Sequence, residues 1–203
     1  MKTSTPPKIK AIIFDLGGVI AHGGYLGFIK NYCAECFTPA GKKKILELER
    51  QVNLAQISER QFYLEIDKLF HVHMKPKIMH DQIVKGMKQN KTLVKFIPKL
   101  KPSKVALFSN SLGRIAAEVL KKQHLSGKQF FDRIFLSTKL HLAKPDKAAY
   151  EYVLGQLKVK PSEAIMVDDR VENILPARRI GMNGIVFKNT AQFARELKKY
   201  QLV

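Results

Sequence analysis

The sequence has no apolar run long enough to cross a membrane, and it has very few cysteines. No stretch approaches the roughly 18 consecutive apolar residues that a transmembrane helix needs. The apolar run behind the basic N-terminus is interrupted by Asp15, and a charge there is not typical of a signal peptide. Cys33 and Cys36 are too few for a disulfide framework. We therefore expect a cytoplasmic protein with no membrane partner.

Acidic residues are also scarce, with 17 Asp plus Glu against 36 Lys plus Arg and a formal net charge of +19. Residues 21–95 carry +6 of this charge and the remainder +13, so the excess is spread along the chain. Arginine-rich arms, zinc-finger spacings and aromatic–basic RNA motifs are all missing. The charge indicates a solvated basic surface suited to small phosphorylated molecules, and it leaves nucleic-acid binding as a second interpretation.

The 203 residues, of which 45% are hydrophobic, are enough for one core domain with a smaller insert and exclude general disorder. The chain alternates between strand and helix patterns in its first 20 and last 100 or so residues. Expected strands cover residues 9–14, 105–108, 133–136, 164–167 and 184–187, and expected helices cover 112–122, 147–157, 172–180 and 190–200. This alternation predicts an α/β fold with a Rossmann-like, doubly wound parallel sheet.

Residues 39–97 show only amphipathic helix patterns, and they interrupt the alternation of strands and helices. Ser58 followed by Gln61 predicts a capping box at the start of one of these helices. We therefore expect a core of residues 1–20 plus 96–203 and a helical cap of residues 21–95. Three histidines in the cap, His71, His73 and His80, are expected to form a surface cluster.

Polar residues follow four of the expected core elements. They are Asp15 after the first strand, Ser109 and Asn110 after the second, Lys144 beyond the third, and Asp168 with Asp169 after the fourth. The carboxyl ends of parallel strands meet at one edge of the sheet, where ligands bind in such folds. Three carboxylates there would repel one another unless a cation lay between them, and an all-oxygen site suits Mg²⁺ beside a phosphate.

Four segments of the chain, in order, resemble the motifs of the haloacid dehalogenase superfamily. They are residues 13–19 (IFDLGGV), 108–110 (FSN), 144–146 (KPD) and 166–169 (MVDD), and the helical insert lies where that family has its cap. Within the family the chain is most similar to glucose-1-phosphate phosphatase-like members and to the N-terminal phosphatase domain of epoxide hydrolases. The resemblance implies a Mg²⁺-dependent hydrolase of a small phosphorylated metabolite.

The resemblance also implies a role for each motif residue. Asp15 would attack phosphorus and carry a covalent aspartyl-phosphate. Ser109 and Lys144 would hold the phosphoryl oxygens, with Asn110 as a further candidate.

The metal site that the resemblance implies uses residues of the first and last motifs. Asp15, Asp168 and the backbone carbonyl of Gly17 would hold Mg²⁺, and Asp169 would orient a water on the metal. The cation would neutralise charge between the nucleophile and the phosphoryl group.

Gly17 departs from the pattern, because phosphatases of this family usually have a second Asp there as general acid and base. Without that acid we expect a preference for esters with good leaving groups, since a positioned acid typically contributes about 10²–10⁴-fold. His22 is a candidate substitute acid or base, with a hinge or pocket-lining role as the alternative.

Two alternative functions stay open from the sequence. Gly17 and the +19 charge also fit a catalytically weak or inactive protein that binds phosphate or nucleic acid. A dehalogenase needs no leaving-group acid, but that branch of the family uses no metal and lacks paired carboxylates such as Asp168 and Asp169.

Overall fold

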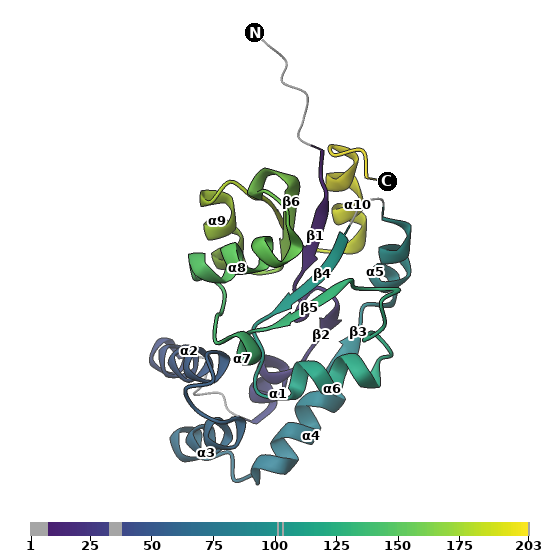
Figure 1. Cartoon of the computed structure of the whole chain (residues 1–203). Coiled ribbons are helices and arrows are strands. Elements are labelled where there is room, and N and C mark those ends of the chain that lie inside the picture. Colours follow the sequence, from purple (N-terminus) through teal and green to yellow (C-terminus); the bar gives the residue numbers. More distant parts are fainter. Residues whose placement is uncertain (1–7, 33–37, 101, 103, 203) are drawn as a thin grey trace.

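A five-stranded parallel sheet forms the centre of the molecule (Figure 1). The computed structural model describes residues 8–32, 38–100, 102 and 104–202. The strands are β1 (Ala11–Phe14), β4 (Lys104–Ser109), β5 (Arg133–Leu136), β6 (Ala164–Asp168) and β7 (Asn183–Val186). Their order in the sheet is β5-β4-β1-β6-β7, so the first strand lies in the middle and the strand order reverses beside it. The predicted α/β fold with a parallel sheet is confirmed.

Both faces of the sheet are buried under helices. Ile12 and Phe14 of β1 pack into one apolar cluster, while Ala11 and Ile13 pack into another. The first cluster includes α5 (Lys91–Phe96), α6 (Ile115–Lys122) and α10 (Thr190–Lys198), and the second α8 (Lys147–Leu157) and α9 (Val171–Arg179). Apolar side chains on both faces explain why the strands read as continuous hydrophobic runs.

Four helices gather at one end of the molecule, beyond the sheet (Figure 1). They are α1 (Tyr25–Tyr32), α2 (Pro39–Asn53), α3 (Glu59–Phe70) and α4 (Pro76–Gly86), and we call them the cap helices. Their buried apolar residues, including Phe62 and Ile83, continue the first apolar cluster of the core. The expected capping box is present: Gln61 N donates to Ser58 Oγ at 3.1 Å, and Ser58 N donates to Gln61 Oε1 at 2.8 Å.

Short elements connect these parts. Two-residue strands β2 (Ala21–His22) and β3 (Lys88–Gln89) pair antiparallel where the chain enters and leaves the cap helices. A short helix, α7 (Ser137–Leu140), follows β5, and single 3₁₀ turns lie at η2 (Ile97–Lys99) and η3 (Pro161–Glu163). No helix among the described residues is long and apolar enough to cross a membrane. Cys33 and Cys36 lie outside the described residues.

The expected surface cluster of histidines is wrong for His80. His71 and His73 are exposed, with their rings stacked at 6.0 Å. His80 is buried, because its face of α4 packs against α6 and α3. Its Nδ1 contacts Glu59 of α3, and its Nε2 lies 2.8 Å from Glu118 Oε2 of α6.

Candidate active site

Three neighbouring strands place polar residues side by side at the carboxyl edge of the sheet. Asp15 directly follows β1, Ser109 ends β4, and Asp168 ends β6. Asp15 N donates to Val167 O at 2.9 Å, so the backbone ladder continues through the aspartate and fixes its position. All three polar side chains are buried. This is the edge, at the reversal of strand order, where ligands bind in such sheets.

Lys144 links two of these residues through its ammonium group. Its Nζ lies 2.8 Å from Asp15 Oδ1 and 2.6 Å from Asp168 Oδ2, and the residue is only 3% exposed. The ammonium group also lies 5.3 Å from the centre of the Phe108 ring, a cation–π contact. A residue 129 positions along the chain from Asp15 therefore completes the site.

Burial and the neighbouring charges both shift the pKa values of Asp15 and Lys144. Burial raises the pKa of Asp15 to about 7, since Lys144 lowers it less than burial and the neighbouring Asp168 raise it. Burial alone would lower the pKa of Lys144, but Asp15 and Asp168 outweigh this effect and hold that pKa above its ordinary value. Lys144 is therefore protonated at neutral pH, while Asp15 needs further positive charge to be fully ionised.

Asp168 is held rigidly by the start of α9. Arg170 N donates to Asp168 Oδ1 at 2.9 Å, and Asn173 Nδ2 lies 3.0 Å from both carboxylate oxygens. Asn173 was not among the predicted site residues. Its position five residues after Asp168, in the first turn of α9, is the signal that could have identified it.

Asn110 contacts the backbone of Lys144 with both ends of its amide. Its Nδ2 donates to Lys144 O at 2.8 Å, and Lys144 N donates to its Oδ1 at 2.9 Å. These bonds fix the loop that carries the ammonium group. They favour a positioning role for Asn110, whereas the sequence predicted a contact to phosphate.

Three carboxylates of the site are close enough to share a metal ion. Asp15, Asp168 and Asp169 each offer an oxygen, and these oxygens lie within 4.8 Å of one another. The Lys144 ammonium group contacts two of these three carboxylates, Asp15 and Asp168. Carboxylate oxygens are the ligands that Mg²⁺ prefers, and the donor set therefore fits this ion.

The Gly17–Gly18 pair brings the backbone close to this cluster. Gly18 has φ +72°, and a Cβ there would lie 2.1 Å from Asp169 Oδ2. A Cβ at Gly17 would meet only Asp15 Oδ2, at 3.8 Å. Gly18 is therefore required by conformation and space, whereas Gly17 leaves room for a side chain that the sequence does not supply.

A cavity of about 370 Å³ lies over the site, between the sheet edge and the cap helices. Asp15, Ser109 and Lys144 form its core side, together with Asp169. His22, the predicted substitute acid or base, also lines it and is exposed.

The cap side of the cavity contains two residues that the sequence analysis missed. They are Tyr25 of α1 and Glu49 of α2. Glu49 gave no signal because it lies among other charged residues of an amphipathic helix, in the stretch KKKILELER.

Comparisons with known proteins find relatives that match parts of this chain. Bifunctional epoxide hydrolase 2 of Rattus norvegicus is 37% identical over 82 residues, which are 40% of this chain and 15% of that protein. Sesquiterpene phosphatase astK of Aspergillus oryzae is 38% identical over 69 residues, which are 34% of this chain and 35% of that protein. The matched stretches thus cover far less than two thirds of these relatives.

A solved structure shows the same fold over nearly the whole chain. A HAD family enzyme of Bacteroides thetaiotaomicron superimposes with a TM-score of 0.76 and 18% identity, covering 94% of this chain and 99% of that one. The same enzyme has been solved in complex with magnesium and inorganic phosphate.

The family itself follows from a match over most of the sequence. The model of the haloacid dehalogenase-like hydrolases matches residues 9–181, a range that contains Asp15, Ser109, Lys144, Asp168 and Asp169. The chain belongs to the haloacid dehalogenase-like hydrolases.

Proposed function

We propose that the protein is a Mg²⁺-dependent phosphomonoester hydrolase that acts on a small phosphorylated metabolite through an aspartyl-phosphate on Asp15. The observation that carries this proposal is the buried bridge of Lys144 between Asp15 and Asp168, with Asp169 beside them. The name of the Aspergillus relative and the magnesium–phosphate complex of the Bacteroides enzyme support it.

Each side chain of the site has a part in the proposed reaction. Asp15 attacks phosphorus with a carboxylate oxygen, the bond between phosphorus and the ester oxygen breaks, and water later hydrolyses the acyl phosphate. Lys144 and the Ser109 hydroxyl donate hydrogen bonds to the phosphoryl oxygens, where negative charge must be stabilised. Asn110 and Asn173 hold Lys144 and Asp168 in place through the contacts described above.

Asp15, Asp168 and the backbone carbonyl of Gly17 would hold the metal, and Asp169 would orient a water on it. Mg²⁺, when bound, supplies positive charge between the nucleophile and the phosphoryl group. The excess of carboxylates and the raised pKa of Asp15, which burial causes, both favour a cation here.

We propose further that the chain functions as a core of residues 1–20 plus 96–203 and a cap of residues 21–95. The placement of the cap helices beyond the sheet and the pairing of β2 with β3 at their base support this division. A cytoplasmic location is part of the same proposal, because the two cysteines are too few for a disulfide framework.

A screen of phosphorylated metabolites with Mg²⁺ tests the proposed reaction. We expect phosphate release by the unaltered protein, none by Asp15→Asn, and unchanged release by Asp81→Asn, an exposed control on α4. Turnover that survives in Asp15→Asn would contradict the role of Asp15. Halide release from a 2-haloacid without Mg²⁺ would indicate a dehalogenase instead.

The absence of an acidic side chain at Gly17 favours one alternative function, which is binding of phosphate without turnover. Tight binding of Mg²⁺ and inorganic phosphate with no hydrolysis of any ester would support it. A DNA or RNA titration at several salt concentrations covers the nucleic-acid form of this alternative, since binding to a phosphate backbone weakens steeply with salt.

A further inference from the structure

At Gly17, where related phosphatases usually have a second Asp, the cavity wall offers no side chain that could donate a proton. A Cβ at Gly17 would have Asp15 Oδ2 as its neighbour at 3.8 Å, so this part of the wall is backbone. Besides the carboxylate cluster and Lys144, four titratable residues line the cavity: His22, Tyr25, Glu49 and Arg170. Arg170 does not lose its proton near neutral pH, which leaves His22, Tyr25 and Glu49 as candidates.

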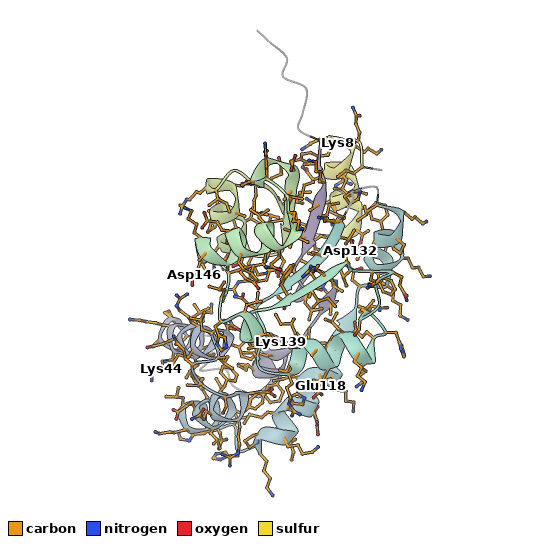
Figure 2. All side chains as sticks on the ribbon, in the orientation of Figure 1. Lys8, Lys44, Glu118, Asp132, Lys139 and Asp146 are labelled. Carbon is orange, nitrogen blue, oxygen red and sulfur yellow. The ribbon has the colours of Figure 1, made fainter. Side chains whose placement is uncertain are left out.

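Glu49 lines the cavity from α2, a helix that contacts the loop that carries Lys144. Arg50, the next residue of α2, contacts Asp146 with both ends of its guanidinium group, at 3.3 and 3.1 Å. Asp146 lies at the boundary between the core and the cap helices and follows Lys144 by two residues (Figure 2). The loop that carries Lys144 therefore also contacts the turn of α2 that carries Glu49.

The direction of the proposed reaction selects the cap side of the cavity. Attack at phosphorus is roughly in line, so the leaving oxygen points away from the attacking oxygen. Asp15 attacks from the sheet edge, and the leaving oxygen therefore faces the cap helices. Glu49 lies on that side of the cavity, whereas His22 lies on β2, next to the Gly17 loop that pairs with Ala21.

We propose that Glu49 is the catalytic proton donor to the leaving group, a cap residue that replaces the acid absent at Gly17. This inference rests on the proposed phosphatase function. As the ester bond breaks, the leaving oxygen takes the proton from the Glu49 carboxyl, which becomes a carboxylate. In the second step the water oxygen bonds to phosphorus while the Glu49 carboxylate takes a proton from that water. The bond between Asp15 and phosphorus breaks, which frees the Asp15 carboxylate, releases inorganic phosphate and restores protonated Glu49.

The surroundings of Glu49 suit a carboxyl that holds a proton. Burial raises its pKa, while Tyr25 and Arg170 lower it by a smaller amount. A general acid works best when its pKa lies near the working pH, and burial moves Glu49 in that direction.

Tyr25 is the neighbour that can orient this carboxyl. Burial raises the pKa of the Tyr25 hydroxyl, and the neighbouring Glu49 carboxylate raises it further. The hydroxyl is buried, and among the described residues it has no hydrogen-bond partner of ordinary geometry. Both residues line the same cavity, so we assign Tyr25 a positioning role towards the Glu49 carboxyl.

The test compares Glu49→Gln with the unaltered protein on two esters. Glutamine keeps the shape and polarity of the side chain but cannot transfer a proton. On glycerol phosphate, a poor leaving group, we expect kcat to fall about 100-fold or more, whereas on p-nitrophenyl phosphate it falls less than about 5-fold. The decline of kcat at high pH on glycerol phosphate, expected in the unaltered protein, should disappear in Glu49→Gln.

Three further variants keep the result interpretable. Glu47→Gln, an exposed residue on the same helix, should match the unaltered protein on both esters. Glu49→Asp keeps a carboxyl and should retain the alkaline decline at a lower rate, which separates proton transfer from a folding defect. His22→Asn should lower both rates equally or not at all.

Several outcomes would overturn the inference. Equal losses on the two esters in Glu49→Gln would show that the residue does not protonate the leaving group. A loss confined to glycerol phosphate in His22→Asn, with Glu49→Gln unaffected, would assign the proton to His22. No turnover of either ester by the unaltered protein would overturn the phosphatase proposal together with this one.

Discussion

Lys144 shows how a single residue can determine both stability and chemistry. Its ammonium group lies between two buried carboxylates, and the residue itself is 3% exposed. Removing one partner of a buried ion pair leaves charge uncompensated away from water, which typically costs about 3–5 kcal/mol. The same ammonium group is the donor that the proposed reaction uses to hold a phosphoryl oxygen.

We therefore predict that Lys144→Met lowers the free energy of unfolding by about 3–5 kcal/mol and abolishes phosphate release. Urea denaturation at pH 8 measures the first effect. Lys147→Met is the matched control, because Lys147 is exposed and forms an ion pair with the exposed Glu151, so its loss should stay below about 0.5 kcal/mol. Equal effects of the two substitutions would contradict the buried bridge.

The two adjacent glycines are predicted to differ sharply. Gly18→Ala requires a left-handed backbone, which costs an alanine about 1 kcal/mol or more, and its Cβ would displace the Asp169 carboxylate. We expect Mg²⁺ affinity to fall about 10-fold or more, as measured by titration calorimetry. Gly17→Ala, whose Cβ has room, should bind Mg²⁺ as the unaltered protein does; a loss of affinity there as large as in Gly18→Ala would contradict this account.

The sequence predicted the strand-end residues but not the residues that support them. Asp15, Ser109 and Asp168 were predictable because a polar residue directly after a buried strand has a defined place at the sheet edge. Asn110 lies at the expected strand end, but its bonds to the Lys144 backbone could not be predicted, because they depend on a loop 34 residues away. Glu49 could not be predicted, because only the packing of α2 brings it to the cavity.

At the scale of elements, His80 connects three helices. It lies on α4, contacts Glu59 of α3, and lies 2.8 Å from Glu118 of α6. Glu118 lies where α6 meets α4 (Figure 2). Arg114 N donates to the other oxygen of Glu59 at 2.8 Å, which adds a second link between the cap helices and the core. Both ring nitrogens face carboxylates, and only the protonated imidazole can donate from both.

This arrangement predicts a pH-dependent contribution to stability. Burial lowers the pKa of His80, but its bonds to Glu118 and Glu59 outweigh burial and raise that pKa above 6.5. The stabilisation is then complete below the unfolded pKa of about 6.5 and is lost as pH rises through the folded value. In urea denaturation, the deficit of His80→Gln should be largest near pH 6 and shrink towards pH 9.

The control for this prediction is His73→Gln, since His73 is exposed. Its free energy of unfolding should differ little from that of the unaltered protein at every pH. A deficit of His80→Gln that stays constant or grows with pH would show that the histidine is not charged in the folded protein.

The large elements were predictable, whereas the short ones were not. The five strands of the central sheet and the helices α6, α8, α9 and α10 were expected within a few residues of their observed ends, because their hydrophobic patterns are long and regular. The strands β2 and β3 have two residues each, too few for a pattern. They form because the chain must enter and leave the cap helices side by side, which is a property of the tertiary structure.

At the scale of the whole molecule, the +19 charge is spread along the sequence of both the cap and the core. Nitrogen-tipped side chains extend from both the cap helices and the core (Figure 2). A field of this kind attracts anionic substrates, and salt screens it because the Debye length falls below about 10 Å above 0.1 M.

We predict that kcat/KM for a phosphate ester falls severalfold between about 20 and 200 mM salt, while kcat changes little. Sodium chloride and sodium acetate at equal ionic strength should give the same decline, which separates screening from competition by chloride. A kcat/KM that is independent of ionic strength would mean that the charge does not guide the substrate.

The most direct test of the proposed function is to trap the covalent intermediate. The protein is mixed with Mg²⁺ and excess p-nitrophenyl phosphate, quenched in acid within the first turnovers, and digested for mass spectrometry. We predict a mass increase of one phosphoryl group on the peptide that contains Asp15, and no increase in Asp15→Asn. Release of nitrophenol with no phosphorylated peptide, or with the phosphoryl group on another residue, would contradict the mechanism.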